Sequence, residues 1–232
     1  MSTAKKSKWL PLESNPQVMN NYVHKLGVSQ AWAYTDVWGL DDELLSMIPK
    51  PVKAVVLLFP VTENYEKDSK EEIKQIQEKG QEISSNVVFY RQTIPNACGT
   101  IGLLHTLASN TEEISVEDGP LKRLLDKTKN LTPEERAKAL EEDEELAEAH
   151  KSSASSGQTS TPREDDDVNS HFVTFIEKDG SLYELDGRKP FPINHGKCAN
   201  LLQDSVGIIR KFMQRDPDNI NFTVIALAPN QQ

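Results

Sequence analysis

The segment HFVTFIEKDGSLYELDG, residues 171–187, decides the fold class. Apolar and polar residues alternate on both sides of Asp179 and Gly180, and an Asp-Gly pair between two alternating runs is a strong β-hairpin signal. A second segment, AVVLLF at 54–59, is apolar throughout and is followed by Pro60, which is typical of a strand covered on both faces. We therefore expect a hairpin at 171–187 and a central strand at 54–59.

Helical periodicity dominates the chain between and around these strands. It predicts helices at 16–26, 41–47, 67–83, 97–108 and 201–213, and two or three more between 119 and 151. A short strand or turn is expected around 34–40, and strands at 86–91 and 221–228. Thr132 and Glu135 have the spacing of a helix capping box. The pattern predicts an α/β (α+β) fold in which a central, mostly antiparallel sheet is flanked by helices.

The composition changes sharply at about 152–168, where SSASSGQTSTPREDDD shows no apolar periodicity. A structureless stretch of this length inside a compact domain is uncommon, and is usually a lid, a binding loop or a linker. The segment that follows it is short for a separate domain. We therefore expect residues 1–232 to form one domain that carries a mobile loop at about 152–168.

The bulk properties exclude several classes of protein. The net charge of -10 argues against nucleic acid, and favours either simple solubility or a basic protein partner. No apolar run is long enough for a bilayer span, and no apolar stretch follows the early lysines as a secretory signal requires. We therefore expect no membrane partner and a cytoplasmic location, where Cys98 and Cys198 stay reduced.

Cys98 is a candidate nucleophile. It lies two positions after Asn96, a good N-cap residue, so its sulfur is expected in the first turn of the helix at 97–108. The positive end of the helix dipole would favour a thiolate there. Gly99 would leave room for a substrate backbone. The alternative is a structural cysteine, because cysteine is among the most buried residue types.

The sequence has five histidines that could act as the base, and position favours His171. His105 lies seven residues along the helix of Cys98, about 10 Å up its axis, and is expected to be packed or on the surface. His24 and His150 lie in charged, helical contexts, and His195, in a polar loop, stays open as an alternative. His171 opens a strand directly after the long loop, where the strand can hold its ring rigidly at a cleft.

Two further residues could complete the site. Pairing across the hairpin brings His171 and Asp186 to neighbouring strand ends, where Asp186 could orient the histidine. The alternative is that Asp186 is only a turn aspartate before a glycine. Gln92, at the end of the strand expected at 86–91, could donate to an oxyanion alongside the Cys98 N–H; otherwise it is an ordinary polar strand end. The sequence has no metal-binding or nucleotide-binding motif, so we expect no metal and no cofactor.

These residues resemble the small ubiquitin carboxyl-terminal hydrolases. The resemblance rests on Gln92, NACGTIGLLH from Asn96, HF at His171 and LYELDGRKPFPINHG from Leu182. WLPLESNP, PVKAVVLLFP and FTVIALA extend it over nearly the whole chain. It implies a papain-like α/β fold with a knotted chain. It also implies that Cys98 is the nucleophile, His171 the base, Asp186 the orienting acid and Gln92 the oxyanion donor.

The same resemblance implies the substrate. The family hydrolyses the bond after the carboxyl-terminal glycine of ubiquitin through a cysteine thioester, releasing small adducts or short peptides. A crossover loop at about 152–168 would exclude folded leaving groups. Implied substrate contacts are Pro11, Leu12, Glu13, Ser14, Asn15, Pro16 and Asp36, of which Leu12 is the apolar one and Glu13 and Asp36 are acidic.

Alternatives to this reading remain open. WLPLESNP could merely pack the amino terminus, and the modifier could be a relative of ubiquitin. A binding module would hold ubiquitin without cleaving it, whereas the enzyme requires a reactive Cys98. We expect the enzyme, acting as a monomer.

Overall fold

A six-stranded sheet forms the centre of the computed structural model, which describes residues 8–158 and 169–231. The strand order is β1-β6-β2-β3-β4-β5, and all neighbouring pairs are antiparallel. The strands are β1 (Trp32–Asp36), β2 (Ala54–Pro60), β3 (Ser170–Lys178), β4 (Ser181–Leu185), β5 (Ile193–Lys197) and β6 (Thr223–Pro229). The mostly antiparallel sheet predicted from the sequence is confirmed.

The central strand β2 divides its side chains between two hydrophobic cores. Val55, Leu57 and Phe59 enter one core, and Ala54 and Val56 enter the other. All five are at most 2% exposed. Both faces of β2 are therefore covered, as predicted, which explains why this segment is apolar at every position rather than at alternate ones.

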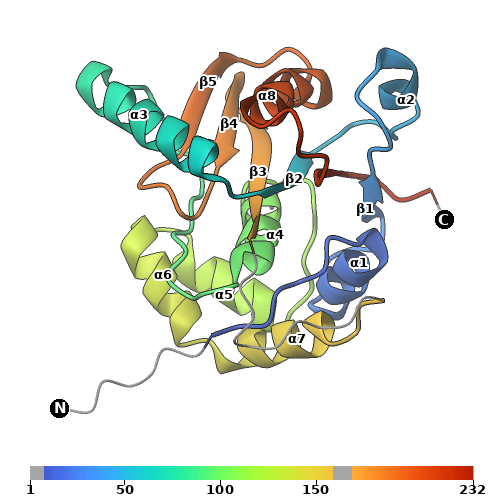
Figure 1. Cartoon of the computed structure of the whole chain (residues 1–232). Helices are drawn as coiled ribbons and strands as arrows, with labels where there is room; N and C mark the ends of the chain where they lie inside the picture. Colours follow the sequence, from blue (N-terminus) through green and yellow to red (C-terminus); the bar gives the residue numbers. More distant parts are fainter. Residues whose placement is uncertain (1–7, 159–168, 232) are drawn as a thin grey trace.

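Helices cover both faces of the sheet (Figure 1). One face packs against α2 (Asp42–Ser46), α3 (Glu63–Lys79) and α8 (Leu201–Arg215). The other packs against α1 (Pro16–Lys25), α4 (Cys98–Ala108), α5 (Pro120–Thr128), α6 (Pro133–Glu141) and α7 (Glu144–Ala154). The predicted helices are confirmed, including the capping box of Thr132 and Glu135. The charged helix begins before its predicted start because Thr62 caps it, and ends before Gly80.

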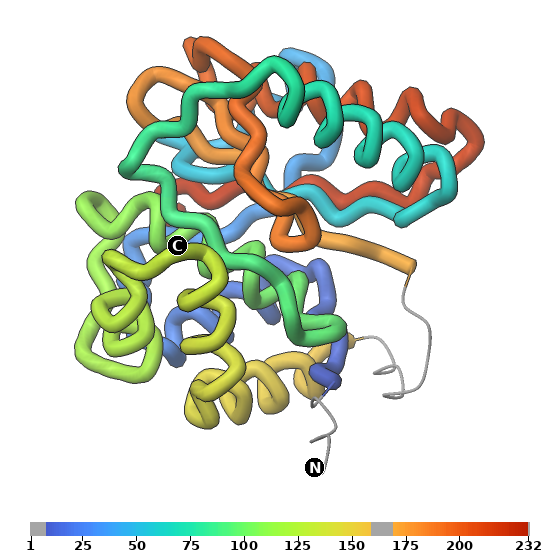
Figure 2. The backbone as a smooth tube through the Cα atoms, turned by 90° about the vertical axis from the view of Figure 1, so that its left-hand side faces the viewer, coloured from blue at the N-terminus to red at the C-terminus, as the bar shows by residue number. Residues whose placement is uncertain are grey.

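The strand predicted at 86–91 is wrong. This segment is irregular and descends from the layer of α3 to the layer of α4 (Figure 2). Its backbone finds side-chain partners: the Tyr90 N–H donates to His105 Nε2 at 3.0 Å, and the Phe89 carbonyl accepts from Arg136 Nη1 at 3.3 Å. Phe89 and Tyr90 are both buried. Buried aromatic residues gave the segment a strand-like composition without a neighbouring strand to pair with.

The hairpin at 171–187 is confirmed. Lys178 lies opposite Ser181, and the two residues between them, Asp179 and Gly180, both have positive φ angles of 49° and 79°. Positive φ at both central positions matches the twist of the flanking strands, and an Asp-Gly pair adopts it readily. Helix α7 continues to Ala154, so the irregular chain begins later than predicted. Residues 159–168 of the predicted loop lie outside the described residues, and the knotted path stays a prediction.

Leu57→Ala is expected to lower the free energy of unfolding by about 3 kcal/mol, because the truncated side chain leaves a cavity in a core that relaxes only partly. Leu57 is fully buried, whereas its neighbour Leu58 is only partly buried against the opposite core. Urea denaturation of the two alanine variants measures the difference. If Leu58→Ala lowered the free energy of unfolding as much as Leu57→Ala, the assignment of the two side chains to differently buried faces would be wrong.

Candidate active site

Cys98 is the first residue of α4, and its side chain is partly buried. The sequence predicted this first-turn position but predicted the wrong cap. Ala97 is the N-cap residue and no side chain caps the helix, since Asn96 adopts a left-handed backbone conformation with φ 63°. The first-turn N–H groups of α4 are therefore not taken up by a capping side chain. The positive end of the helix favours a thiolate at Cys98.

The space above Gly99 is not open to a substrate backbone, contrary to the expectation from the sequence. A Cβ atom built on Gly99 would lie 2.7 Å from Leu12 Cβ and 3.4 Å from a ring carbon of Phe172. Leu12 is 5% exposed, so in this conformation it packs beside the candidate nucleophile. Glycine is required at 99 because the amino-terminal segment crosses α4 closely at this point.

His171 and Asp186 form the contact that the hairpin predicted. His171 Nε2 lies 2.6 Å from Asp186 Oδ1, and both residues are buried. Burial alone would lower the pKa of His171, but the charge and hydrogen bond of Asp186, with a smaller effect of Cys98, raise the pKa of His171 to about 9. His171 is thus held in its imidazolium form at neutral pH.

The thiol of Cys98 meets the same imidazole. Burial raises the pKa of the Cys98 thiol, but the hydrogen bond and charge of His171 outweigh burial, so the pKa of Cys98 is lowered. Backbone hydrogen bonds at Phe172 and Gly99 act in the same direction. Since His171 Nε2 is bound to Asp186, Nδ1 is the nitrogen left for the sulfur. The arrangement supports a thiolate–imidazolium pair.

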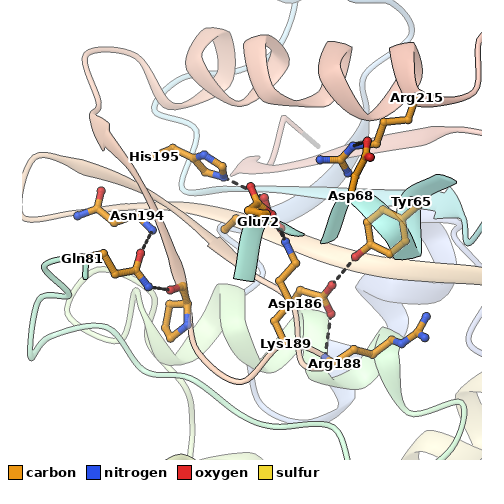
Figure 3. Close-up of polar contacts among 12 residues, drawn as sticks. Tyr65, Asp68, Glu72, Gln81, Asp186, Arg188, Lys189, Asn194, His195 and Arg215 are labelled. Atoms are coloured by element: carbon orange, nitrogen blue, oxygen red, sulfur yellow. Dashed lines mark hydrogen bonds and ion pairs between the residues drawn. The ribbon is translucent and has the colours of Figure 1, made fainter. Parts of the chain in front are cut away.

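Asp186 is fixed by more than the histidine. The Tyr65 hydroxyl donates to its Oδ2 at 2.8 Å, and the Arg188 backbone N–H donates to its Oδ1 at 2.8 Å (Figure 3). Burial would raise the pKa of Asp186, but the charge and hydrogen bond of His171, the charge of Lys189 and the Arg188 N–H hold this pKa well below its usual range. Sequence reasoning missed Tyr65, because it lies on α3 and no local pattern links it to residue 186.

A cleft of about 480 Å³ gives access to the site. Its lining includes Cys98, His171, Gln92, Asn96 and Arg188. The Gln92 side chain is turned inward, where Nε2 donates to the Ile94 carbonyl at 3.2 Å. Gln92 Oε1 and Asn96 Nδ2 are buried without a hydrogen-bond partner in the described part of the chain. Sequence reasoning did not assign the Asn96 side chain to the cleft, because it expected that side chain to cap α4.

None of the seven residues predicted to contact substrate lines this cleft, although Leu12 packs against Gly99 next to it. Asn15 caps α1 by accepting from the Gln17 N–H at 2.9 Å, and Pro16 begins that helix. Asp36, at the end of β1, lines a second groove of about 790 Å³ together with Pro16. Burial raises the pKa of Asp36. Pro11, Glu13 and Ser14 are half-buried. Their contact with a substrate stays a prediction.

The other histidines play different parts. His105 is packed, as expected, and its ring stacks on Phe89. His150 is buried rather than lying on a charged surface: its ring nitrogens contact Thr100 Oγ1 at 2.7 Å and the Leu10 carbonyl at 2.6 Å, and burial lowers its pKa to about 4. His195 was expected in a polar loop, which is wrong, because it lies on β5.

Within residues 8–158 and 169–231, no three histidine, cysteine or acidic side chains are grouped so that they could hold a metal ion. Across the same residues, no helix has the length and apolar character needed to cross a membrane.

Comparison with known proteins identifies the family. The family model for ubiquitin carboxyl-terminal hydrolase, family 1, matches residues 9–214. A ubiquitin carboxyl-terminal hydrolase of Drosophila melanogaster is 46% identical over 97% of this chain and 99% of its own length. Ubiquitin carboxyl-terminal hydrolase isozyme L1 of Rattus norvegicus is also 46% identical, over 94% of this chain and 96% of its own length.

Solved structures support the same fold. The catalytic domain of UCH37 from Trichinella spiralis, determined bound to ubiquitin vinyl methyl ester, matches with a TM-score of 0.75 at 22% identity and covers 97% of both chains. This likeness supports the papain-like architecture that the resemblance implied. Because the family model matches most of the chain and two relatives share 46% of its sequence over nearly their whole length, the chain belongs to family 1 of the ubiquitin carboxyl-terminal hydrolases.

Proposed function

We propose that this chain is a thiol-dependent deubiquitinating hydrolase that cleaves the bond after the carboxyl-terminal glycine of ubiquitin. One observation carries the proposal: Cys98, His171 and Asp186 form a continuous chain of contacts at the cleft. Relatives with the same family model carry the name of this activity, and the UCH37 structure contains a ubiquitin derivative. Family membership favours the enzyme over a module that only binds ubiquitin.

The residues divide the reaction between them. The Cys98 thiolate attacks the carbonyl carbon of the terminal glycine, while His171 holds the proton that left the thiol. His171 Nδ1 then gives this proton to the leaving amine, and the C–N bond breaks to leave a thioester. His171 next takes a proton from water, whose oxygen attacks the thioester; the C–S bond then breaks and the sulfur leaves as a thiolate, which restores the thiolate–imidazolium pair. Asp186 keeps the imidazole oriented through both steps.

The oxyanion is assigned to two donors, the Cys98 backbone N–H and Gln92 Nε2. Before substrate binds, Gln92 Nε2 donates to the Ile94 carbonyl. The amide nitrogen of Gln92 carries two hydrogens, so one can stay with the Ile94 carbonyl while the other donates to the oxyanion, which stabilises the tetrahedral intermediate and not the ground state.

The remaining assignments rest on family likeness. We assign residues 1–232 to one catalytic domain, acting as a cytoplasmic monomer. The preferred leaving groups are small adducts and short peptides. The basic tail of ubiquitin is assigned to the segment from Pro11 to Pro16 and to Asp36, where acidic charge complements it.

Activity is expected to follow a bell-shaped pH profile with an unusually alkaline descending limb. It should rise as pH passes upward through the lowered pKa of Cys98, because the thiolate is the nucleophile. It should fall near pH 9, where His171 loses the proton that the leaving amine needs. Measurement of kcat/KM from about pH 5 to about pH 10 checks this. A descending limb near the ordinary histidine pKa would contradict the proposed ion pair.

The central experiment uses ubiquitin that carries a fluorescent amine on its carboxyl-terminal glycine. The native protein should release the dye with multiple turnovers, and a short dye-labelled peptide ending in glycine should be a much poorer substrate. Ubiquitin with an electrophile at its terminus should form a covalent adduct, which peptide mass spectrometry should locate at Cys98. Stable binding of ubiquitin with neither release nor adduct would favour the binding module instead.

A further inference from the structure

A buried ion cluster lies behind Asp186, and none of the roles above uses it. It consists of Lys189, Glu184, Glu72 and His195. Lys189 Nζ lies 2.6 Å from Glu184 Oε1 and 2.8 Å from Glu72 Oε2, while Glu184 Oε2 lies 2.9 Å from His195 Nε2. Lys189 is 2% exposed and Glu184 is 1% exposed. Figure 3 shows Lys189 extending away from Asp186 toward Glu72.

The backbone of Lys189 belongs to the turn that carries the orienting acid. The Lys189 N–H donates to the Asp186 carbonyl at 2.9 Å, and the Arg188 N–H donates to the Asp186 carboxylate at 2.8 Å. In the same turn, the Gly187 carbonyl accepts from the Gln92 N–H at 2.8 Å. The turn thus positions both the proposed orienting acid and the proposed oxyanion donor, and the Lys189 side chain anchors its far end.

Stability alone does not explain such an anchor. Lys189 and Glu184 are both removed from water, which is costly, and their mutual attraction often does no more than offset that cost. A hydrophobic side chain of similar length would commonly stabilise a fold as well or better. The cluster also spans the layers of the site: Glu72 lies on α3, Glu184 on β4 and His195 on β5. Its contacts therefore tie the turn to α3 and β4 directly, and to β5 through the hydrogen bond between Glu184 and His195.

We propose that Lys189 is a positioning residue for the hydrolase, because its ammonium, clamped between Glu184 and Glu72, holds the turn 186–189 where Asp186 reaches His171. The inference rests on the proposed function for its effect on turnover. The charged and titratable groups that interact with Asp186 come from four places: His171 from β3, Tyr65 from α3, His105 from α4, and Lys189 and Arg188 from the turn. Lys189 also contributes to holding the pKa of Asp186 low.

The test compares Lys189→Met, Glu184→Gln and the double variant, in which both charges are removed. Lys189→Met should lower kcat by about 10- to 100-fold with little change in KM, since it displaces a proposed catalytic group and not a substrate contact. It also leaves excess negative charge, which should shift the alkaline limb upward by roughly half a pH unit. Glu184→Gln should shift that limb downward, and the double variant should return it toward the native position.

Lys178→Met is the matched control. Lys178 is a partly buried lysine that donates to the Ser109 carbonyl at 3.2 Å, but it lies at the opposite end of β3 from His171. Its removal should leave kcat and the pH limbs unchanged. Thermal unfolding of every variant reports whether the fold is intact.

Turnover of the ubiquitin–dye substrate and alkylation of Cys98 together distinguish a failure of the positioning role from a failure of the proposed function. Alkylation of Cys98 by iodoacetamide as a function of pH needs no ubiquitin, so it measures the effect of Lys189 on the thiol and imidazole even if the proposed substrate is wrong. A loss of kcat with little change in KM in folded Lys189→Met, together with opposite shifts in the two single variants and a double variant near native, supports the positioning role. Equal shifts in both single variants, or unchanged kcat and pH limbs in folded Lys189→Met, would overturn it.

Discussion

Cys98→Ser is expected to lower kcat/KM on the ubiquitin–dye substrate by at least about 10⁴-fold, because an alcohol beside His171 is a far weaker nucleophile than a thiolate. The substitution removes little volume and keeps a polar atom at the start of α4, so the fold should persist. The measurement is the initial rate of dye release under single-turnover conditions, which excludes effects on product release.

Cys198→Ser provides the matched control, because Cys198 is the second thiol of the chain and has the opposite environment. Burial, its hydrogen bond to Asp204 and the charges of Asp204 and Glu177 raise the pKa of Cys198 to about 12. It is therefore protonated and unreactive at neutral pH. Cys198→Ser should retain native kcat/KM and native alkylation kinetics. If instead Cys198→Ser lost activity and Cys98→Ser kept it, the assignment of the nucleophile would fail.

His171→Gln is expected to reduce kcat/KM by about 10³- to 10⁴-fold, because the thiol loses the hydrogen bond and charge that lower its pKa. Glutamine can still donate to Asp186, so the hairpin end keeps a partner. The alkylation rate of Cys98 should then show a thiol pKa raised to its ordinary range or above, since burial remains and the imidazolium is gone.

His24→Gln serves as the control for losing a histidine. His24 lies on α1, where its Nε2 contacts the Trp32 carbonyl at 3.0 Å, far along the chain from the hairpin. The His24 variant should alkylate with the native pH profile. Native thiol reactivity in His171→Gln would show that the helix dipole alone activates Cys98, and would remove His171 from the mechanism.

Local sequence patterns were enough to predict much of the site. Cys98 was placed at a helix start by the turn residues before it, and the Asp179–Gly180 hairpin placed His171 near Asp186. These features depend on short-range rules: where a helix begins, and how a two-residue turn sets strand register. Substrate and chemistry came from resemblance to a family, since many unrelated proteins share these local patterns.

Contacts between distant segments could not be predicted in this way. Tyr65 reaches Asp186 across the layer interface, and Leu12 occupies the space above Gly99. Neither contact leaves a periodic signal. The error at 86–91 has a related cause: the partners of its backbone, His105 and Arg136, are side chains supplied by remote helices. The buried aromatic residues of this segment resemble those of a strand in the sequence. Its backbone, however, bonds to side chains and not to a neighbouring strand.

The position of β6 has a consequence for when this protein can first work in the cell. Residues 223–229 lie between β1 and β2, so the strand that is made last is inserted between two strands that are made early. A nascent chain still attached to the ribosome short of this point lacks a central partner for β2, the strand that pairs with the strand of His171. Cys98 is therefore synthesised long before the sheet that positions His171 can be completed. Peptidase activity must wait until β6 has been translated.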